Sequence, residues 1–142
     1  SGAREGCRQA LVAARLMSQH LVELNAALRA EREEPLRIGI GIHTGPIIIG
    51  EMGYGGAVAM TAIGDAVNTA SRLETLTKEF GCELVVSDEV VARAGLDLSP
   101  FPRHEIEVRG KREALAVRTV ARAGELPPTP APVTRTPAQA IA

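Results

Sequence analysis

Apolar residues recur at intervals of three and four in the first part of the chain, and this spacing predicts an amphipathic helix over residues 6–32. Charged and polar residues occupy the opposite side, so we interpret the stripe as a core-facing surface rather than a docking face for a partner helix. Pro35 cannot continue the helix and also restricts Glu34, so the helix must end before this point. The apolar positions are Leu11, Ala14, Met17, Leu21, Leu24 and Leu28.

A pattern with the period of β-strands follows the helix. Residues 36–45 (LRIGIGIHTG) alternate isoleucine with glycine, and residues 46–53 (PIIIGEMG) contain a β-branched run. We predict two strands joined by a turn at residues 44–46. Residues 54–59 (YGGAVA) are predicted to form a loop or hairpin tip, and residues 60–64 (MTAIG) a short strand.

The second half of the chain alternates helical and strand patterns. Asp65 is a candidate N-cap for a helix over residues 66–79, and Gly81 follows the end of that helix. This order predicts an α+β fold, with helices packed on one face of a mostly antiparallel sheet. The further elements expected are a buried strand at 82–87, a short helix at 88–95, and a β-hairpin of 104–110 with 113–122.

The C-terminal residues differ from the rest in composition. Residues 124–142 are rich in proline and lack an apolar period. We therefore predict a disordered tail at 124–142, following a single domain of residues 1–123.

Composition limits the classes of function. Aromatic residues are only 2% of the 142 residues and the formal net charge is −1, so no nucleic-acid partner is expected. No run of 18 apolar residues occurs, so we expect no membrane contact from this chain and a cytoplasmic location, with membrane attachment of the full-length protein left open. Cys7 and Cys82 lie far apart in sequence and no CxxC pattern occurs, which favours two reduced thiols over a disulfide or a zinc site.

Two features near the middle of the chain have more than one interpretation. Eight glycines fall between residues 39 and 64, and this concentration indicates a close approach of backbones. The stretch GEMGYGG, residues 50–56, matches neither common phosphate-loop pattern, so we favour a hairpin tip over a phosphate cradle. His43 has no second His or Cys nearby and is interpreted as hydrogen-bonded at a strand end rather than as a ligand.

Asn68 and Arg72 are separated by four residues, which places both on one side of the predicted helix, about 6 Å apart along its axis. An amide and a forked cation can hold a phosphorylated substrate and stabilise developing charge, but neither is a general base at neutral pH. The alternative is an exposed Asn with an Arg paired to Glu74 or a neighbouring acid, and spacing alone favours that alternative. The core face of this helix is predicted to be Val67, Ala70, Leu73 and Leu76.

These stretches together resemble the class III nucleotidyl cyclases from about residue 7 to residue 121. The specific match is LRIGIGIHTGPIIIGEMG followed, eight residues after Gly53, by TAIGDAVNTASRLE, with VRGK near the end. The resemblance implies a ferredoxin-like sandwich whose active site lies between two catalytic domains packed head to tail, here a homodimer. It also implies conversion of a nucleoside triphosphate to a cyclic nucleotide and pyrophosphate, for intracellular signal transduction.

The resemblance also implies roles for four residues. Asn68 orients the ribose, Arg72 stabilises the phosphate in the transition state, and Arg109 contacts the triphosphate. Thr61 reads the purine and favours ATP over GTP. Two Mg or Mn ions are expected, but the family's two metal-binding aspartates lie upstream of the helix with which this chain begins, so no metal ligand is assigned here.

We therefore interpret the chain as the C-terminal portion of an adenylate cyclase catalytic domain that lacks the N-terminal strands. By itself it is expected to be inactive. Two alternatives stay open: a catalytically silent regulatory or dimerisation module of the same fold, and an unrelated ferredoxin-like domain that binds a small molecule. Met60 and Ala59 depart from the family, which commonly has an aromatic residue and an acid at these positions.

Overall fold

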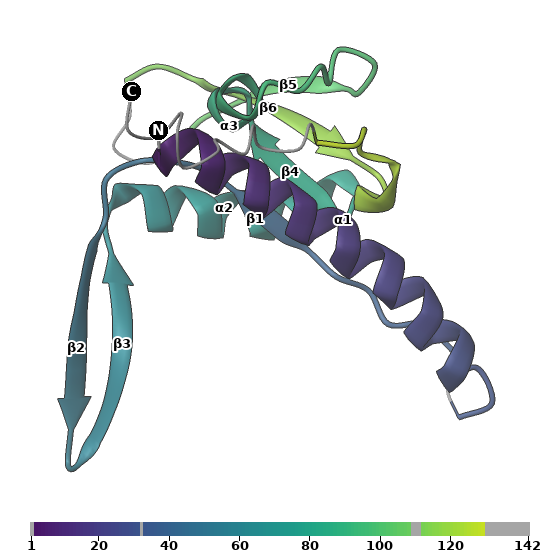
Figure 1. Cartoon of the computed structure of the whole chain (residues 1–142), viewed down its shortest axis with the longest axis horizontal. Helices are drawn as coiled ribbons and strands as arrows, with labels where there is room; N and C mark the ends of the chain where they lie inside the picture. Colours follow the sequence, from purple (N-terminus) through teal and green to yellow (C-terminus); the bar gives the residue numbers. More distant parts are fainter. Residues whose placement is uncertain (1, 32, 109–111, 130–142) are drawn as a thin grey trace, which may run out of the picture.

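The computed structural model describes residues 2–31, 33–108 and 112–129, without the side chains of residues 52, 54 and 57–59. Its elements follow one another along the chain as Figure 1 shows. They are α1 (Gly2–Leu28), β1 (Ile40–Ile42), β2 (Ile48–Tyr54), β3 (Ala57–Ile63), α2 (Asp65–Phe80), β4 (Leu84–Ser87), α3 (Asp88–Ala94), β5 (Arg103–Ile106), β6 (Leu115–Val120) and a 3₁₀ turn, η1 (Ala123–Glu125).

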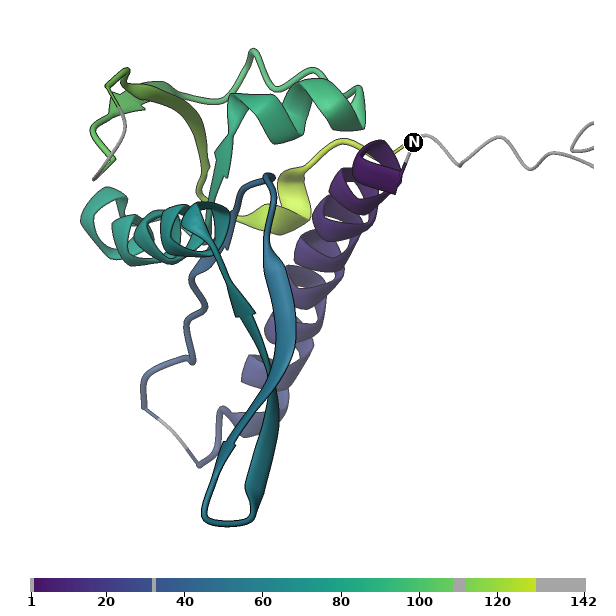
Figure 2. The same cartoon turned by 90° about the vertical axis from the view of Figure 1, so that its left-hand side faces the viewer.

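Four strands form a mixed sheet in the order β1-β4-β6-β5. β1 and β4 are parallel, whereas β4 with β6 and β5 with β6 are antiparallel. The α+β class is therefore confirmed, and so is the predicted hairpin of β5 and β6, whose connecting residues 109–111 lie outside the described residues. β2 and β3 pair only with each other in the described structure and project from the body as a two-stranded arm (Figures 1 and 2).

The helices cover both faces of the sheet, so the prediction that they pack on one face is wrong. All four residues of β4 are buried. Leu84 and Val86 pack with α1 and α3, while Val85 packs with Leu73 and Leu76 of α2. Successive side chains of a strand point to opposite faces, so an uninterrupted apolar strand needs a cover on each side (Figure 2).

Only the first half of α1 contributes to the core. Cys7, Leu11, Ala14 and Ser18 are its buried residues. The predicted helix is confirmed, with bounds four residues earlier than expected, but Met17 and Leu24 are 51% and 46% exposed rather than core-facing. The second half of α1 extends beyond the sheet, which accounts for the exposure of Leu24 (Figure 1). Met17 directly precedes buried Ser18, so it is exposed because it lies on the outward side of the helix.

Gly41 of β1 and Gly39 just before it let α2 approach the sheet closely, as the concentration of glycines predicted. A Cβ on Gly41 would collide with the backbone of Ala70 and Glu74, and a Cβ on Gly39 would collide with the Thr77 side chain. The stretch GEMGYGG forms the end of the arm, with positive φ angles of 63° and 87° at Gly55 and Gly56. The hairpin tip is therefore confirmed, but it is shorter than the predicted range 54–59, because β2 extends to Tyr54 and β3 begins at Ala57. The segment does not take the strand–loop–helix form of a phosphate cradle.

Of the two predictions for the ends of α2, the one for its N-cap is wrong and the one for its C-terminus is confirmed. Gly64 occupies the N-cap position and Asp65 is already helical, so Asp65 is not the cap. Gly64 has φ 153°, a conformation that glycine adopts readily, and this sharp turn from β3 takes the place that a capping side chain would fill. At the other end, Gly81 is left-handed at φ 63° and its N–H donates to the Thr77 carbonyl, as predicted for a helix C-terminus.

The chain stays packed beyond the boundary predicted at residue 123. η1 packs on α1, and Leu126 is only 3% exposed within the core cluster that also contains Leu11. The first residues of the predicted tail are therefore structured, and residues 130–142 lie outside the described residues. No helix in the described part of the chain is long and apolar enough to cross a membrane.

Leu126→Ala tests this extension of the core. We expect the substitution to lower the free energy of unfolding by about 2 kcal/mol, because it leaves a cavity beneath α1. Chemical denaturation monitored by circular dichroism measures the change. Pro128→Ala, at an exposed position two residues later, is the control and should change stability by less than about 0.5 kcal/mol. Equal stability of the two variants would show that residues 124–129 do not belong to the domain.

Candidate active site

Asn68 and Arg72 both lie on the exposed side of α2. The Arg72 side chain is 46% exposed, and its Nη1 atom lies 3.9 Å from Oε1 of Glu79, whose side chain is 62% exposed. An ion pair this long and this exposed contributes little and is easily exchanged for another partner. Arg72 is therefore paired with an acid, as the alternative interpretation expected, but weakly and with Glu79 rather than Glu74. Because Asn68 and Arg72 are both exposed, both are accessible to a second molecule.

The packing of α2 explains why these two side chains face outward. Its buried residues are Ala66, Thr69, Leu73, Leu76 and Thr77. Leu73 and Leu76 match the predicted core face, but Val67 and Ala70 are only half-buried. The first turns are rotated because α2 rests with its backbone on Gly41 and with Ala66 on Gly45, contacts that the helical period alone does not reveal.

Thr61 reaches the same region from β3. It pairs in register with Gly50 of β2 and is half-buried. The turn at Gly64 separates it from α2, and the Asn68 N–H donates to the Gly64 carbonyl at 3.2 Å. The structure therefore joins Thr61, Asn68 and Arg72 through one short strand–turn–helix unit, while Arg109 lies outside the described residues.

His43 has the structural contact expected for it. Its Nδ1 atom lies 2.9 Å from the Ser87 hydroxyl oxygen, at the adjoining ends of β1 and β4. The two cysteines are free, as the sequence predicted. Burial raises the pKa of the Cys82 thiol, which favours its protonated form.

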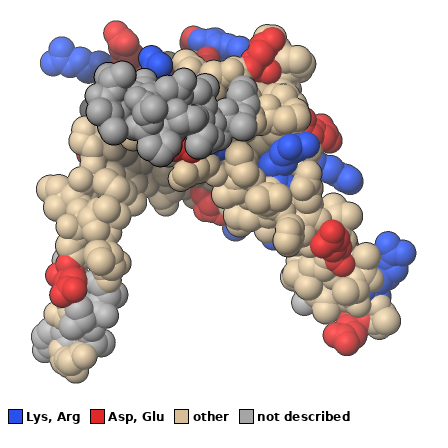
Figure 3. Space-filling view, viewed as in Figure 1, with Lys and Arg blue, Asp and Glu red and all other residues tan. Residues whose placement is uncertain are grey.

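The β2–β3 arm presents an apolar surface that the sequence-based reasoning missed. Most of its described surface is neither acidic nor basic (Figure 3). The signal was present in the sequence, because the run Ile47-Ile48-Ile49 gives both faces of the strand apolar side chains. The exposed fractions are 44% for Ile47, 74% for Ile48, 62% for Ile49, 73% for Met60 and 51% for Ile63.

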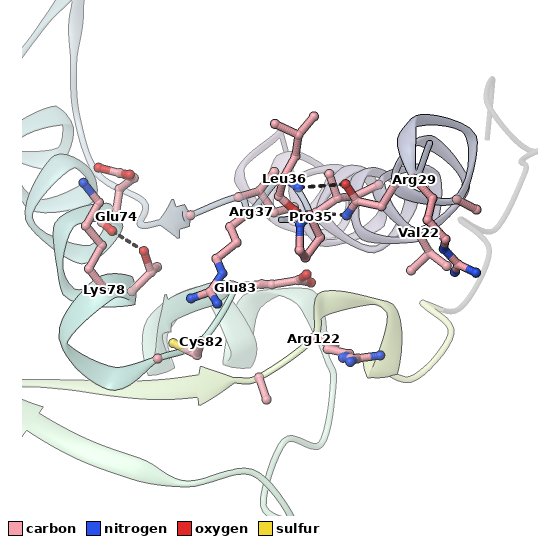
Figure 4. A pocket seen from close by; sticks show the side chains of 18 residues that line it. Val22, Arg29, Pro35, Leu36, Arg37, Glu74, Lys78, Cys82, Glu83 and Arg122 are labelled. Atoms are coloured by element: carbon pink, nitrogen blue, oxygen red, sulfur yellow. Dashed lines mark hydrogen bonds between the residues drawn. The ribbon is translucent and has the colours of Figure 1, made fainter. Parts of the chain in front are cut away.

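A separate cavity of about 850 Å³ lies between the second half of α1, residues 35–39 and the end of α2 (Figure 4). The side-chain amide of Asn25 joins α1 to residues 35–39 along one side of the cavity. It accepts a hydrogen bond from the Leu36 N–H at 2.8 Å and donates one to the Leu36 carbonyl at 3.0 Å. None of Thr61, Asn68 and Arg72 lines this cavity. The cavity is therefore distinct from the surface of β3 and α2 that carries the candidate residues.

The described residues do not fit a metal site. Within ranges 2–31, 33–108 and 112–129, no group of three His, Cys, Asp or Glu side chains is placed to hold a metal ion. The exposed pair on α2 consists of an amide and a guanidinium, and a guanidinium is not a metal ligand. The chemistry available from these residues is binding, orientation and charge stabilisation.

Comparison with known proteins identifies the family. Residues 1–119 match the family model of the adenylate and guanylate cyclase catalytic domain. The chain therefore belongs to this family, which confirms the class indicated by its motifs. Members of the family produce cyclic nucleotides, use divalent metal ions, bind nucleotides and dimerise.

Individual relatives include enzymes of both specificities. The chain is 36% identical over 118 residues to an adenylate cyclase of Anabaena cylindrica, covering 78% of this chain and 24% of that protein. It is 33% identical over 111 residues to retinal guanylyl cyclase 2 of Rattus norvegicus, covering 78% of this chain and 10% of that protein. The chain thus spans a quarter or less of the length of these relatives.

A solved structure supports the fold. The crystal structure of the guanylyl cyclase Cya2 superposes with a TM-score of 0.65 at 24% identity, covering 82% of this chain and 59% of that one. The arrangement of three helices, the four-stranded mixed sheet and the arm in the described residues is therefore an arrangement found in cyclases.

Proposed function

We propose that this chain is the C-terminal part of an adenylate cyclase catalytic domain, which forms cyclic AMP and pyrophosphate from ATP at a site shared with a second catalytic domain. The observation that carries the proposal is the outward-facing pair of Asn68 and Arg72 on α2, in a chain of the cyclase family. A pair buried against its own core would be unable to reach a nucleotide bound across a subunit boundary.

In the proposed reaction the 3′-hydroxyl of the ribose attacks the α-phosphorus in line. The bond from this phosphorus to the bridging oxygen breaks, pyrophosphate leaves with that electron pair, and the hydroxyl proton passes to solvent. Asn68 orients the ribose through its amide. Arg72 stabilises the charge that develops on the phosphate oxygens, and Arg109 binds the triphosphate.

Divalent ions would add charge neutralisation at the phosphates when bound. The described part of this chain has no carboxylate cluster for them, so we assign their ligands to a segment outside it. No role in this proposal requires a metal ligand from this chain.

Two features of the described structure support the proposal that upstream strands belong to the same domain. Within the described residues, β1 is an edge strand that pairs only with β4. The outward side of α1 exposes apolar residues, among them Leu16 at 48% and Val22 at 61%. An unpaired strand edge and exposed apolar side chains on the neighbouring layer both suit added strands, and we propose that upstream strands complete a ferredoxin-like sheet.

The exposed apolar surface of the arm supports the proposal that a second catalytic domain is the partner. A two-stranded hairpin with no further cover is marginally stable in water, and this arm exposes apolar residues on both faces. We propose that the partner in a head-to-tail homodimer covers it. Thr61 lies on the same arm, so dimerisation would bring the purine-reading residue and the partner's surface together.

The test is nucleotide turnover by the 142-residue chain and by the complete enzyme that includes an upstream segment. We expect the complete enzyme to convert ATP to cyclic AMP with Mn²⁺ and to prefer ATP over GTP, and the chain alone to show no turnover. A complete protein that binds ATP but turns over neither nucleotide would favour the catalytically silent module. Turnover by the isolated chain would contradict the assignment of essential groups outside it.

Thr61→Ala tests the purine preference. The Thr61 hydroxyl is proposed to accept a hydrogen bond from the exocyclic amine of adenine, so its loss should reduce the ATP-to-GTP ratio of kcat/KM about tenfold. Thr75→Ala is the control, since the Thr75 hydroxyl donates to the Ser71 carbonyl on exposed α2 surface. An unchanged nucleotide ratio in Thr61→Ala would remove Thr61 from the assignment.

A further inference from the structure

The ends of two neighbouring strands meet in a side-chain pair close to α2. β1 and β4 run parallel with Ile42 opposite Val86, so His43 and Ser87 are the next residues on each strand. The 2.9 Å hydrogen bond between His43 Nδ1 and the Ser87 hydroxyl joins them. Ser87 is completely buried and His43 is half-buried, so the bond is shielded from water.

Ser87 also occupies the N-cap position of α3, with an extended backbone at φ −71° and ψ 146°. A serine at this position ordinarily accepts a hydrogen bond from the first turn of its helix, worth about 1 kcal/mol. Among the described residues, the Ser87 side chain makes no such capping bond. The Ser87 hydroxyl bonds His43 and does not cap α3.

His43 begins the connection of residues 43–47 between β1 and β2, and this connection packs against the turn before α2. A Cβ on Gly45 would lie 2.9 Å from the Cβ of Ala66. A Cβ on Gly64 would lie 3.0 Å from the Pro46 carbonyl oxygen and 3.3 Å from Cα of Ile47. The two backbones are in close contact, so a shift of the connection toward the turn would displace the turn.

That turn sets the position of Thr61 relative to Asn68. Gly64 follows Thr61 by three residues and accepts the hydrogen bond of the Asn68 N–H at 3.2 Å. A continuous set of contacts therefore runs from buried Ser87 through His43 and residues 43–47 to Gly64. Its far end is the strand–turn–helix unit that carries the candidate active-site residues.

We infer that His43, held by Ser87, is a positioning residue of the nucleotide site, fixing the geometry between β3 and α2. The expected effect on kcat rests on the proposed function, whereas the expected effect on the geometry between β3 and α2 does not. His43 contacts no reacting group in this assignment. A small misplacement of positioning groups can reduce a rate by up to about 100-fold, so loss of this pair should lower kcat about 10- to 100-fold and change KM much less.

The experiment compares His43→Ala, Ser87→Ala and the double variant in the complete enzyme. The double variant should have the kcat of His43→Ala, because the His43–Ser87 hydrogen bond is already lost in that variant. His43→Asn should recover most of the rate, since an Asn amide can place a hydrogen-bonding atom where Nδ1 lies. Ser18→Ala is the matched control: Ser18 is 3% exposed, and its hydroxyl donates to Glu83 at 2.6 Å on the other side of the sheet.

Hydrogen exchange on the purified 142-residue chain provides a readout that needs no activity. Exchange at residues 61–68 should rise several-fold in His43→Ala and Ser87→Ala and stay unchanged in Ser18→Ala. Equal exchange in all three variants overturns the inference whether or not the complete enzyme is active. If the wild-type enzyme is active, kcat values of His43→Ala and Ser87→Ala no lower than that of Ser18→Ala overturn it as well. Absence of cyclase activity in the wild-type enzyme counts against the proposed function alone.

Discussion

Replacing Arg72 by alanine in the complete enzyme is expected to lower kcat about 100- to 1000-fold, equivalent to about 3–4 kcal/mol of transition-state stabilisation. The charge on the phosphate oxygens grows as the 3′-hydroxyl attacks, so a guanidinium aimed at them acts mainly on the transition state. KM for ATP should change much less than kcat. Steady-state kinetics with ATP, measured by cyclic AMP formation, provides both values.

The chain offers a matched control in Arg93→Ala. Arg93 is an exposed arginine on α3, paired with Glu89 at 3.1 Å, with 43% of its side chain exposed against 46% for Arg72. Each substitution removes one surface ion pair, so each should change the free energy of unfolding by less than about 1 kcal/mol. Only Arg72→Ala should reduce activity. A similar loss of kcat in both variants would assign the effect to surface charge in general rather than to a site on α2.

Segments with strong periodicity were predictable because local spacing alone determines them. The long first helix, α2 with Gly81 at its end, α3 with Gly95 and the β5–β6 hairpin all follow from such patterns. The α2 pair was also predictable as a pair, since residues four apart on a helix share a side wherever the helix packs. Its exposure was not predictable, because that depends on which neighbour α2 meets.

What the sequence did not reveal are contacts between distant segments. The rotation of α2 depends on Gly41 and Gly45, and Leu24 is exposed because the sheet ends before α1 does. The His43–Ser87 bond joins residues 44 positions apart, and a serine beside a helix start is read locally as a cap. Two sequence signals pointed to such contacts: glycine-rich strands, and strands with apolar residues on both faces. Both indicate close packing but do not identify the segment that packs there.

Gly41→Ala is expected to be the most destabilising of the substitutions considered, at about 3 kcal/mol in the free energy of unfolding. The added Cβ collides with the Ala70 carbonyl and with the backbone of Glu74, atoms that cannot rotate away as a flexible side chain can. Relief requires α2 to move off β1, and overpacking of this kind costs about 1–3 kcal/mol, occasionally more. Because α2 carries Asn68 and Arg72, the same movement should lower kcat in whatever protein remains folded.

Gly50→Ala is the matched control, since Gly50 also lies within a strand, in β2, and an added Cβ there meets no described atom within 4 Å. This substitution should leave stability unchanged or raise it slightly, because alanine loses less backbone entropy than glycine on folding. Denaturant unfolding of both variants measures the difference. Equal stabilities would mean that α2 does not rest on β1 as closely as the structure has it, and the orientation of the Asn68–Arg72 pair would then lose its physical basis.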